Sequence, residues 1–122
     1  MKDTPNEKGF SVSLFVNNKP GVLVRIAQTF ARRGYNIDSL VVSSAHDSRY
    51  SRITVVFQGD YENVDQILRQ LNKLIDVVHA VQHGTDTSVD REMALFKVGV
   101  KPNKRAEVFQ IIDVFRAKTV DI

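Results

Sequence analysis

The 122-residue sequence predicts an α+β sandwich, because strand-like and helix-like patterns of apolar residues alternate along most of its length. Apolar and polar residues alternate over residues 10–17 and 51–58, as in strands with one buried face. Residues 20–33 and 61–74 instead repeat apolar side chains every three or four positions, as amphipathic helices do. Two further β-rich runs lie at residues 35–45, before the second strand named above, and at residues 75–83, after the second helix. The order of elements is therefore βαββαβ, which is typical of a ferredoxin-like sandwich.

Turn and capping residues support the boundaries of these elements. Pro20 suits the first turn of the first helix, where its missing N–H costs no hydrogen bond. Gly34 suits the left-handed conformation that ends many helices. Residues 35–45 form the second strand, and Asp60 can cap the second helix through its side-chain oxygen. Residues 75–83 return to a strand pattern and complete the sheet.

Such a sheet carries both helices on one face, so its other face meets solvent or a partner. We expect Phe15, Val42 and Val56 on that open face. A second copy of the sheet could cover them.

A shorter version of the same pattern follows the first domain, which we place at residues 9–84. A polar linker covers residues 85–92, and strand-like alternation follows over residues 94–100. Residues 93–122 are therefore interpreted as the βα beginning, plus the start of the next strand, of a second ferredoxin-like domain that is truncated before it closes. Its helix is expected to present an apolar stripe made of Val108, Ile111, Ile112 and Phe115.

The composition limits the chemistry and the location that are expected for this chain. The chain has no cysteine, so disulfides, a thiolate nucleophile and cysteine-based metal sites are excluded, and a reducing, cytoplasmic location is expected. No apolar run approaches the length of a membrane span, and residues 1–9 lack the apolar centre of a signal peptide. The net charge of +3 leaves nucleic acid open as a partner.

The turn Asn17-Asn18-Lys19-Pro20-Gly21, between the first strand and the first helix, is the best candidate for a ligand site. Gly21 has no Cβ, so a ligand can approach the backbone closely. Free N–H groups and the positive end of the helix dipole favour a carboxylate there. No catalytic group accompanies the turn, and the residues alone leave open that Asn18 and Gly21 only cap the helix.

Five segments of the sequence share features with a known protein family. They are Asn17-Asn18-Lys-Pro-Gly21-Val-Leu, Phe30-Ala-Arg-Arg-Gly34-Tyr35-Asn36-Ile37-Asp38-Ser39-Leu40, Ser51-Arg52-Ile53-Thr54, Gln70-Leu-Asn-Lys-Leu74-Ile-Asp-Val77 and Arg91-Glu92-Met93-Ala94-Leu95. Together they resemble the small regulatory subunit of acetohydroxyacid synthase, also called acetolactate synthase. The resemblance covers residues 9–122. The run from Arg33 to Leu40 is specific to that family, whereas a Pro-Gly turn occurs in many ACT domains.

This resemblance implies an N-terminal ACT domain, a C-terminal ferredoxin-like domain and no catalytic activity of the chain's own. It implies a homodimer that binds valine or another branched-chain amino acid for feedback inhibition and activates a large catalytic subunit. Thiamine diphosphate, Mg and FAD are expected on that partner, with no cofactor in this chain. Neither nucleic acid nor a membrane is implied as a partner.

The resemblance also implies that the effector lies between two ACT domains of a dimer. The first loop of one chain would supply Asn18, Pro20, Gly21, Val22 and Leu23, and the start of the second strand of the other would supply Asn36 and Ile37. Residue chemistry agrees with this assignment. The two asparagines offer amide oxygens to the ammonium and amide N–H groups to the carboxylate, and the aliphatic residues can line an apolar pocket.

Other candidates are weaker. His79 and His83 are four apart, which places them on one face of a strand, but zinc usually takes three or four protein ligands. We interpret this pair as a solvated strand edge and predict no metal site and no catalytic residue.

Two alternative functions share the βαββαβ order. An RNA-binding module fits the basic pI, but such modules read bases with aromatic rings on their central strands, and Phe57 shares the face of Ile53 and Val55. A small acylphosphatase-like hydrolase fits an anion-binding turn, but this turn contains no arginine. The order of elements does not by itself decide between these functions.

Overall fold

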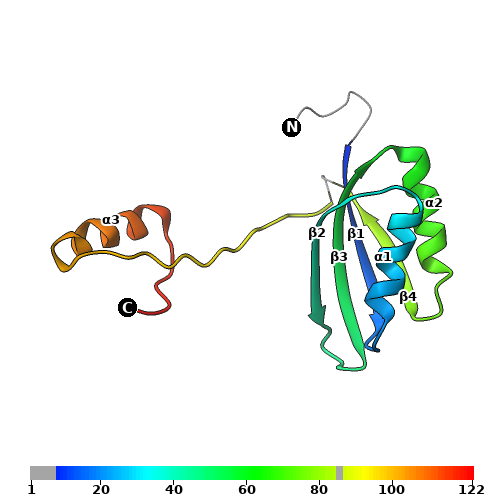
Figure 1. The fold of residues 1–122 in the computed structure, drawn as a ribbon, viewed down its shortest axis with the longest axis horizontal. Helices are drawn as coiled ribbons and strands as arrows, with labels where there is room; N and C mark the ends of the chain where they lie inside the picture. The colour runs from blue at the N-terminus through cyan, green and yellow to red at the C-terminus, as the bar shows by residue number, and fades with distance from the viewer. Residues whose placement is uncertain (1–7, 85–86) are drawn as a thin grey trace. The chain divides into compact units, whose positions relative to one another are not determined.

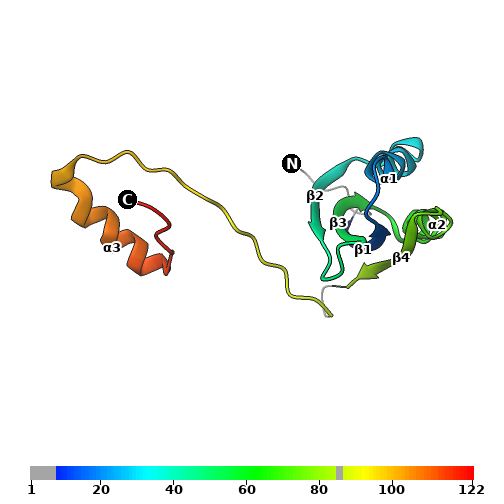
Figure 2. The ribbon, with the colours of Figure 1, turned by 90° about the horizontal axis from the view of Figure 1, so that it is seen from below.

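In the computed structural model, residues 8–84 and 87–122 are described. The chain divides into two compact units, Met1–Val89 and Asp90–Ile122. The first unit contains β1 (Lys8–Asn17), α1 (Val22–Arg32), β2 (Ile37–Ser44), β3 (Tyr50–Gly59), α2 (Tyr61–Asn72) and β4 (Val77–His83). The antiparallel sheet has the order β2-β3-β1-β4, and both helices lie on one side of it (Figures 1 and 2). The predicted α+β class and βαββαβ order are confirmed.

The core of this unit lies between the sheet and the two helices. Alternate residues of the central strands point into it, as the period of two requires. Each helix contributes one buried stripe with helical spacing. The buried apolar residues are Phe10, Val12, Leu14 and Val16 of β1; Val22, Ile26 and Phe30 of α1; Ile53, Val55 and Phe57 of β3; Val64, Ile67 and Leu71 of α2; and Val77 and Ala80 of β4.

The predicted helices, residues 20–33 and 61–74, overlap α1 and α2 closely, but α1 begins at Val22, so Pro20 precedes the helix and does not lie in its first turn as expected. Gly21, just before α1, has a φ of 84°, and Gly34, just after it, has a φ of 76°; both lie in the left-handed region that favours glycine. The side chain of Asp60 accepts a hydrogen bond from the N–H of Asn63 at 2.9 Å, which caps α2 as predicted.

A β-bulge at Asp38 makes one sequence-based expectation wrong. Ile37 lies opposite Phe57 but Ser39 lies opposite Val56, so Asp38 is an extra residue in β2. The bulge exchanges the two faces of the rest of the strand. Val42 therefore lies opposite the buried Ile53, on the helix side of the sheet, and not on the open face where we expected it.

The two edges of the sheet differ in their free backbone groups. At β4, the N–H of Ala80 donates to Oδ1 of Asn72 at 2.9 Å, and Nδ2 of Asn72 donates to the carbonyl of Ala80 at 3.4 Å. A side chain of α2 thus occupies both backbone groups of Ala80. The exposed middle of β2, the other edge, receives no side-chain hydrogen bond of this kind from the residues that the structure describes.

The second unit contains a 3-10 turn, Pro102–Lys104, followed by α3 (Arg105–Phe115). Residues 94–100, for which alternation predicts a strand, and the last residues of the chain have no strand assignment. A β-strand needs a neighbouring strand to accept and donate its backbone hydrogen bonds, and the described residues of the second unit contain no strand that could do so. Residues 85–86 of the predicted linker lie outside those ranges. None of the described helices is long and apolar enough to cross a membrane.

Candidate effector site

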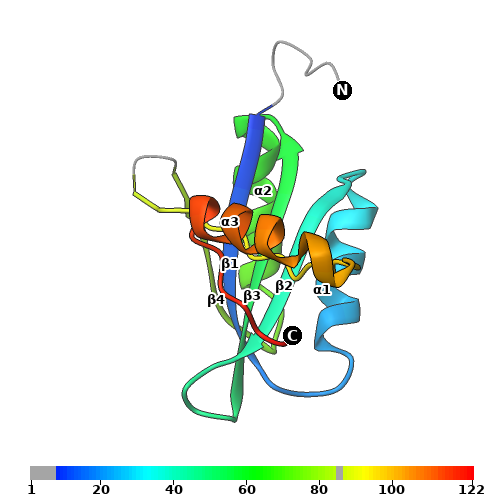
Figure 3. The ribbon, with the colours of Figure 1, turned by 90° about the vertical axis from the view of Figure 1, so that its left-hand side faces the viewer.

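The turn between β1 and α1 is held in place by the hairpin between β2 and β3. The N–H of Asn18 donates to the carbonyl of Arg49 at 2.8 Å, and Nδ2 of Asn18 donates to the carbonyl of Ser48 at 3.1 Å. Figure 3 shows the turn and this hairpin at the same end of the sheet. Since Nδ2 is directed at Ser48, Oδ1 of Asn18 is the atom of this amide that can accept a hydrogen bond from a ligand's ammonium group.

The start of α1 presents backbone donors. The N–H of Arg25 donates to the carbonyl of Gly21 at 3.2 Å, which is the first α-helical hydrogen bond. The N–H groups of Leu23 and Val24 donate to no backbone carbonyl within the described residues. The first turn of α1 also contains no acidic residue. Such a helix start can accept a carboxylate, because free N–H groups and the helix dipole both favour negative charge.

The apolar residues predicted for the site have different surroundings. The side chain of Val22 is 4% exposed and packs in the core, whereas Leu23 is 39% exposed. Pro20 is also exposed. Of the two adjacent aliphatic residues, Leu23 can therefore contact a ligand with its side chain, whereas Val22 can contribute only through its backbone.

Asn36 and Ile37 lie at the other end of α1 (Figure 1). Ile37 is opposite Phe57 and packs against the core, and Asn36 is exposed. The 11 residues of α1 span roughly 16 Å at the rise of an α-helix. One chain therefore does not bring Asn18 and Asn36 around a single amino acid, and the two halves of the predicted site are far apart within it.

The hairpin beside the turn contains a tight ion pair. Nη2 of Arg49 lies 2.6 Å from Oδ2 of Asp47, and the backbone N–H of Arg49 donates to Oδ1 of Asp47 at 3.0 Å. These hydrogen bonds from Arg49 lower the pKa of Asp47 to about 2. Since the carbonyls of Ser48 and Arg49 hold Asn18, the hairpin connects this ion pair to the candidate site.

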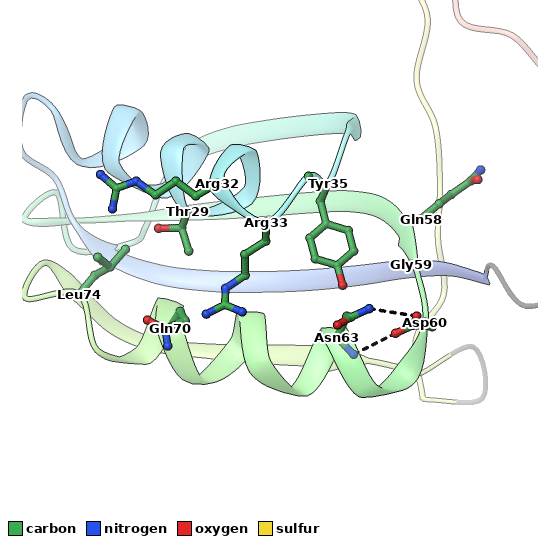
Figure 4. A pocket seen from close by; sticks show the side chains of 11 residues that line it. Thr29, Arg32, Arg33, Tyr35, Gln58, Gly59, Asp60, Asn63, Gln70 and Leu74 are labelled. Carbon is green, nitrogen blue, oxygen red and sulfur yellow. Dashed lines mark hydrogen bonds between the residues drawn. The ribbon is translucent and has the colours of Figure 1, made fainter.

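A groove of about 740 Å³ lies between the end of α1 and α2, and sequence analysis missed it. Figure 4 shows the hydroxyl of Tyr35 directed toward Asn63 and Asp60, and the side chain of Arg33 extending toward α2. The Tyr35 hydroxyl is buried and has no hydrogen-bond partner among the described residues. Burial raises the pKa of Tyr35, Asp60 raises it further, and Arg33 opposes the shift.

The ring of Tyr35 requires a glycine across the groove. A Cβ atom at Gly59 would lie 2.6 Å from Cε1 of Tyr35, closer than real Cβ contacts allow. The ring also packs edge-on against Phe57, so it has little room to move away. No sequence signal linked Tyr35 to Gly59, because the contact joins two segments that meet only in the folded domain.

The open face of the sheet carries a row of rings. Phe15 stacks on Tyr50, with ring centroids 4.9 Å apart, and contacts His79 at 5.7 Å. Tyr50 belongs to β3, although the sequence pattern placed it before that strand. His83 lies on the same face, within hydrogen-bonding distance of Ser13 at 2.7 Å. The described residues contain no group of three His, Cys, Asp or Glu side chains that could hold a metal ion.

Comparison with known proteins identifies two matching family descriptions. Residues 12–79 match the AHAS small subunit-like ACT domain, and residues 91–122 match the small subunit of acetolactate synthase. The probable acetolactate synthase small subunit of Archaeoglobus fulgidus is 44% identical over 112 residues, which are 92% of this chain and 70% of that protein. The acetolactate synthase small subunit of Mycolicibacterium smegmatis is 42% identical over 112 residues, or 92% of this chain and 66% of that protein.

Solved structures agree with these matches. The acetolactate synthase small subunit of Thermotoga maritima superposes with a TM-score of 0.74 at 29% identity, covering 94% of this chain and 72% of that one. The ACT domain of a GTP pyrophosphokinase from Chlorobium tepidum superposes with a TM-score of 0.59 over 73% of this chain and 97% of that one. At 12% identity, that second likeness shows the fold alone. This chain spans about two thirds of the length of its curated relatives. It belongs to the family of acetolactate synthase small subunits and carries that family's ACT regulatory domain.

Proposed function

We propose that this chain binds valine, or another branched-chain amino acid, between the ACT domains of a homodimer and thereby regulates a catalytic large subunit. The observation that carries the proposal is the start of α1, where backbone donors are free and acidic residues are absent. A free amino acid always carries a carboxylate, which this helix start is suited to accept. The exposed side chain of Leu23 beside it favours an aliphatic ligand.

The separation of Asn18 from Asn36 supports a site that is shared between two chains. Asn36 immediately precedes β2, and β2 runs back toward the end of the sheet where Asn18 lies. If two copies pair antiparallel through their β2 strands, the start of β2 in one copy lies beside the end of β2 in the other. This arrangement brings Asn36 of one chain toward Asn18 of its partner, and the two-fold axis generates two equivalent sites.

The edges of the sheet favour β2 as the interface. Leu40, Val41 and Val42 leave between 41% and 60% of their surfaces exposed along β2, and unpaired strand edges readily pair with another chain. At β4, the amide of Asn72 already occupies both backbone groups of Ala80. Pairing through β4 would have to break these hydrogen bonds, and it would not bring Asn36 near the turn.

Regulation would follow from linkage. An effector that bridges two chains binds the paired arrangement of ACT domains more tightly than other arrangements, so it shifts the dimer toward that arrangement. A catalytic large subunit that senses this arrangement would change its activity by the corresponding coupling free energy. The chain itself would supply no catalytic group, and the cofactors of the reaction would belong to the large subunit.

A mixing experiment tests the shared site. Asn18→Ala and Asn36→Ala homodimers are each expected to bind valine weakly, because every site lacks one polar contact. A mixture that exchanges subunits is expected to regain one intact site per heterodimer, which calorimetry counts directly. The matched control is Asn103→Ala, the same change in the second unit, which should leave affinity and stoichiometry unchanged. A mixture that binds no better than its parents, or a monomer that binds valine tightly, would contradict the proposal.

A further inference from the structure

The carboxylate of Asp76 joins three parts of the chain beside the candidate site. Asp76 lies in the corner between α2 and β4, and its side chain is 13% exposed. Its Oδ2 accepts a hydrogen bond from Nη1 of Arg25 at 2.9 Å, and its Oδ1 accepts one from Nδ2 of Asn17 at 3.3 Å. Nζ of Lys19 lies 3.9 Å from the same Oδ1. One carboxylate therefore contacts the end of β1, the turn and the first part of α1.

Backbone hydrogen bonds complete these connections. The N–H of Asn17 donates to the carbonyl of Asp76 at 2.8 Å, so both the side chain and the main chain of Asp76 hold the end of β1. Arg25 donates its N–H to the carbonyl of Gly21, while its guanidinium reaches Asp76. Arg25 thus connects the first hydrogen bond of α1 to the corner that follows α2.

We propose that Asp76 is a positioning residue of the effector site. By holding both ends of the turn, it keeps the free N–H groups at the start of α1 directed toward the ligand's carboxylate. Asp76 would not touch the effector and would act through Asn17, Lys19 and Arg25. The inference rests on the proposed function, because it takes the start of α1 as the place where the carboxylate binds.

The exposure of the two cations indicates where the effect of Asp76 should appear. The side chains of Lys19 and Arg25 are 67% and 61% exposed, and exposed ion pairs contribute little to folding stability. Ligand binding to a loose turn, however, loses conformational entropy because the turn must become ordered, and a pre-formed turn avoids this loss. Loss of the Asp76 carboxylate should therefore weaken binding more than it weakens folding.

The test compares Asp76→Asn with Arg25→Gln, with the double variant and with Asp65→Asn, which makes the same charge change at an exposed residue of α2. Calorimetry with L-valine measures affinity in the full chain. Amide hydrogen exchange measures the order of the turn at its two ends, because the N–H of Asn17 donates to the carbonyl of Asp76 and the N–H of Arg25 donates to the carbonyl of Gly21.

Asp76→Asn is expected to weaken valine binding about tenfold and to speed exchange at Asn17 and Arg25, while its thermal unfolding stays close to that of Asp65→Asn. The double variant should lose no more affinity than Asp76→Asn alone, because both changes act through one contact.

Unchanged valine affinity in Asp76→Asn overturns the inference. If that variant does not fold, Arg25→Gln takes its place, and unchanged affinity and exchange in Arg25→Gln overturn the inference equally. If the unmodified chain does not bind valine, the proposed function is wrong. The exchange rates of Asp76→Asn then still decide whether Asp76 orders the turn.

Discussion

Replacing Gly21 by Asp and, separately, by Asn tests whether the start of α1 receives the effector's carboxylate. Both side chains have nearly the same shape, and both must adopt the left-handed backbone at a φ of 84°. That conformation costs a residue other than glycine about 1–2 kcal/mol. A Cβ at this position meets no atom within 4 Å, so neither variant should clash with the rest of the domain. The pair therefore isolates the effect of one negative charge.

The size of that effect follows from the exposure of the turn. Two unit charges about 4 Å apart repel by about 1 kcal/mol in water and about 4 kcal/mol at the dielectric typical of protein surfaces. Because Gly21 is exposed, we expect an intermediate value of about 2 kcal/mol, or a roughly thirtyfold loss of valine affinity in Gly21→Asp relative to Gly21→Asn.

Folding stability, unlike valine affinity, should not fall when the negative charge is added. A carboxylate near the positive end of α1 is favourable for the helix, so Gly21→Asp should unfold at the same temperature as Gly21→Asn or slightly above it. Calorimetry with valine and thermal unfolding of the two variants give both readouts. Equal valine affinities in two folded variants would show that the ligand's carboxylate does not bind at this helix start.

Three further predictions concern the groove and the hairpin. Gly59→Ala should lower the free energy of unfolding by about 1–3 kcal/mol, measured by chemical denaturation, because the new Cβ would overlap the ring of Tyr35. Tyr35→Phe should raise that free energy by about 1 kcal/mol in the same assay, because it removes a buried hydroxyl without a partner; a loss of stability would show that the hydroxyl is hydrogen-bonded. Asp47 should titrate near pH 2 by NMR, and Arg49→Gln should return its pKa toward 3.8. Since the folded-state pKa is lowered, the stabilisation by this carboxylate is complete above pH 3.8 and disappears as the pH falls toward 2.

The parts of the fold that depend on local chemistry could be predicted from the sequence. Alternation predicts the central strands because each has one buried and one exposed face. Gly34 predicts the end of a helix because glycine readily adopts a left-handed backbone. Asp60 predicts the start of a helix because its side chain can accept a hydrogen bond from a backbone N–H in the first turn. The turn at Gly21 could be recognised for the same reason. Its surroundings could not, because Asp76 reaches it from a distant part of the sequence.

The wrong or missing predictions share a dependence on tertiary contacts. The bulge at Asp38 inserts one residue into a period of two. No local sequence signal predicts this bulge, so alternation alone predicts Val42 on the wrong face of the sheet. Residues 94–100 have the alternation of a strand, but alternation does not provide the neighbouring strand that pairing needs. The contact between Tyr35 and Gly59 likewise exists only once the end of β3 packs beside the end of α1.

The bulge at Asp38 also determines what lies beneath an effector in a paired sheet. By exchanging the faces of β2, it turns Leu40 and Val42 toward the helix side, opposite Val55 and Ile53, at the exposed rim of the sheet. If two β2 strands pair, these side chains from both copies meet across the two-fold axis, because residues on one face of paired strands are neighbours. They would then form a continuous aliphatic floor between the two α1 helices. If β2 instead paired regularly, with Asp38 opposite Val56, then Ser39, Val41 and Ser43 would lie on the helix side, so the bulge decides whether this floor is aliphatic throughout or interrupted by hydroxyl groups.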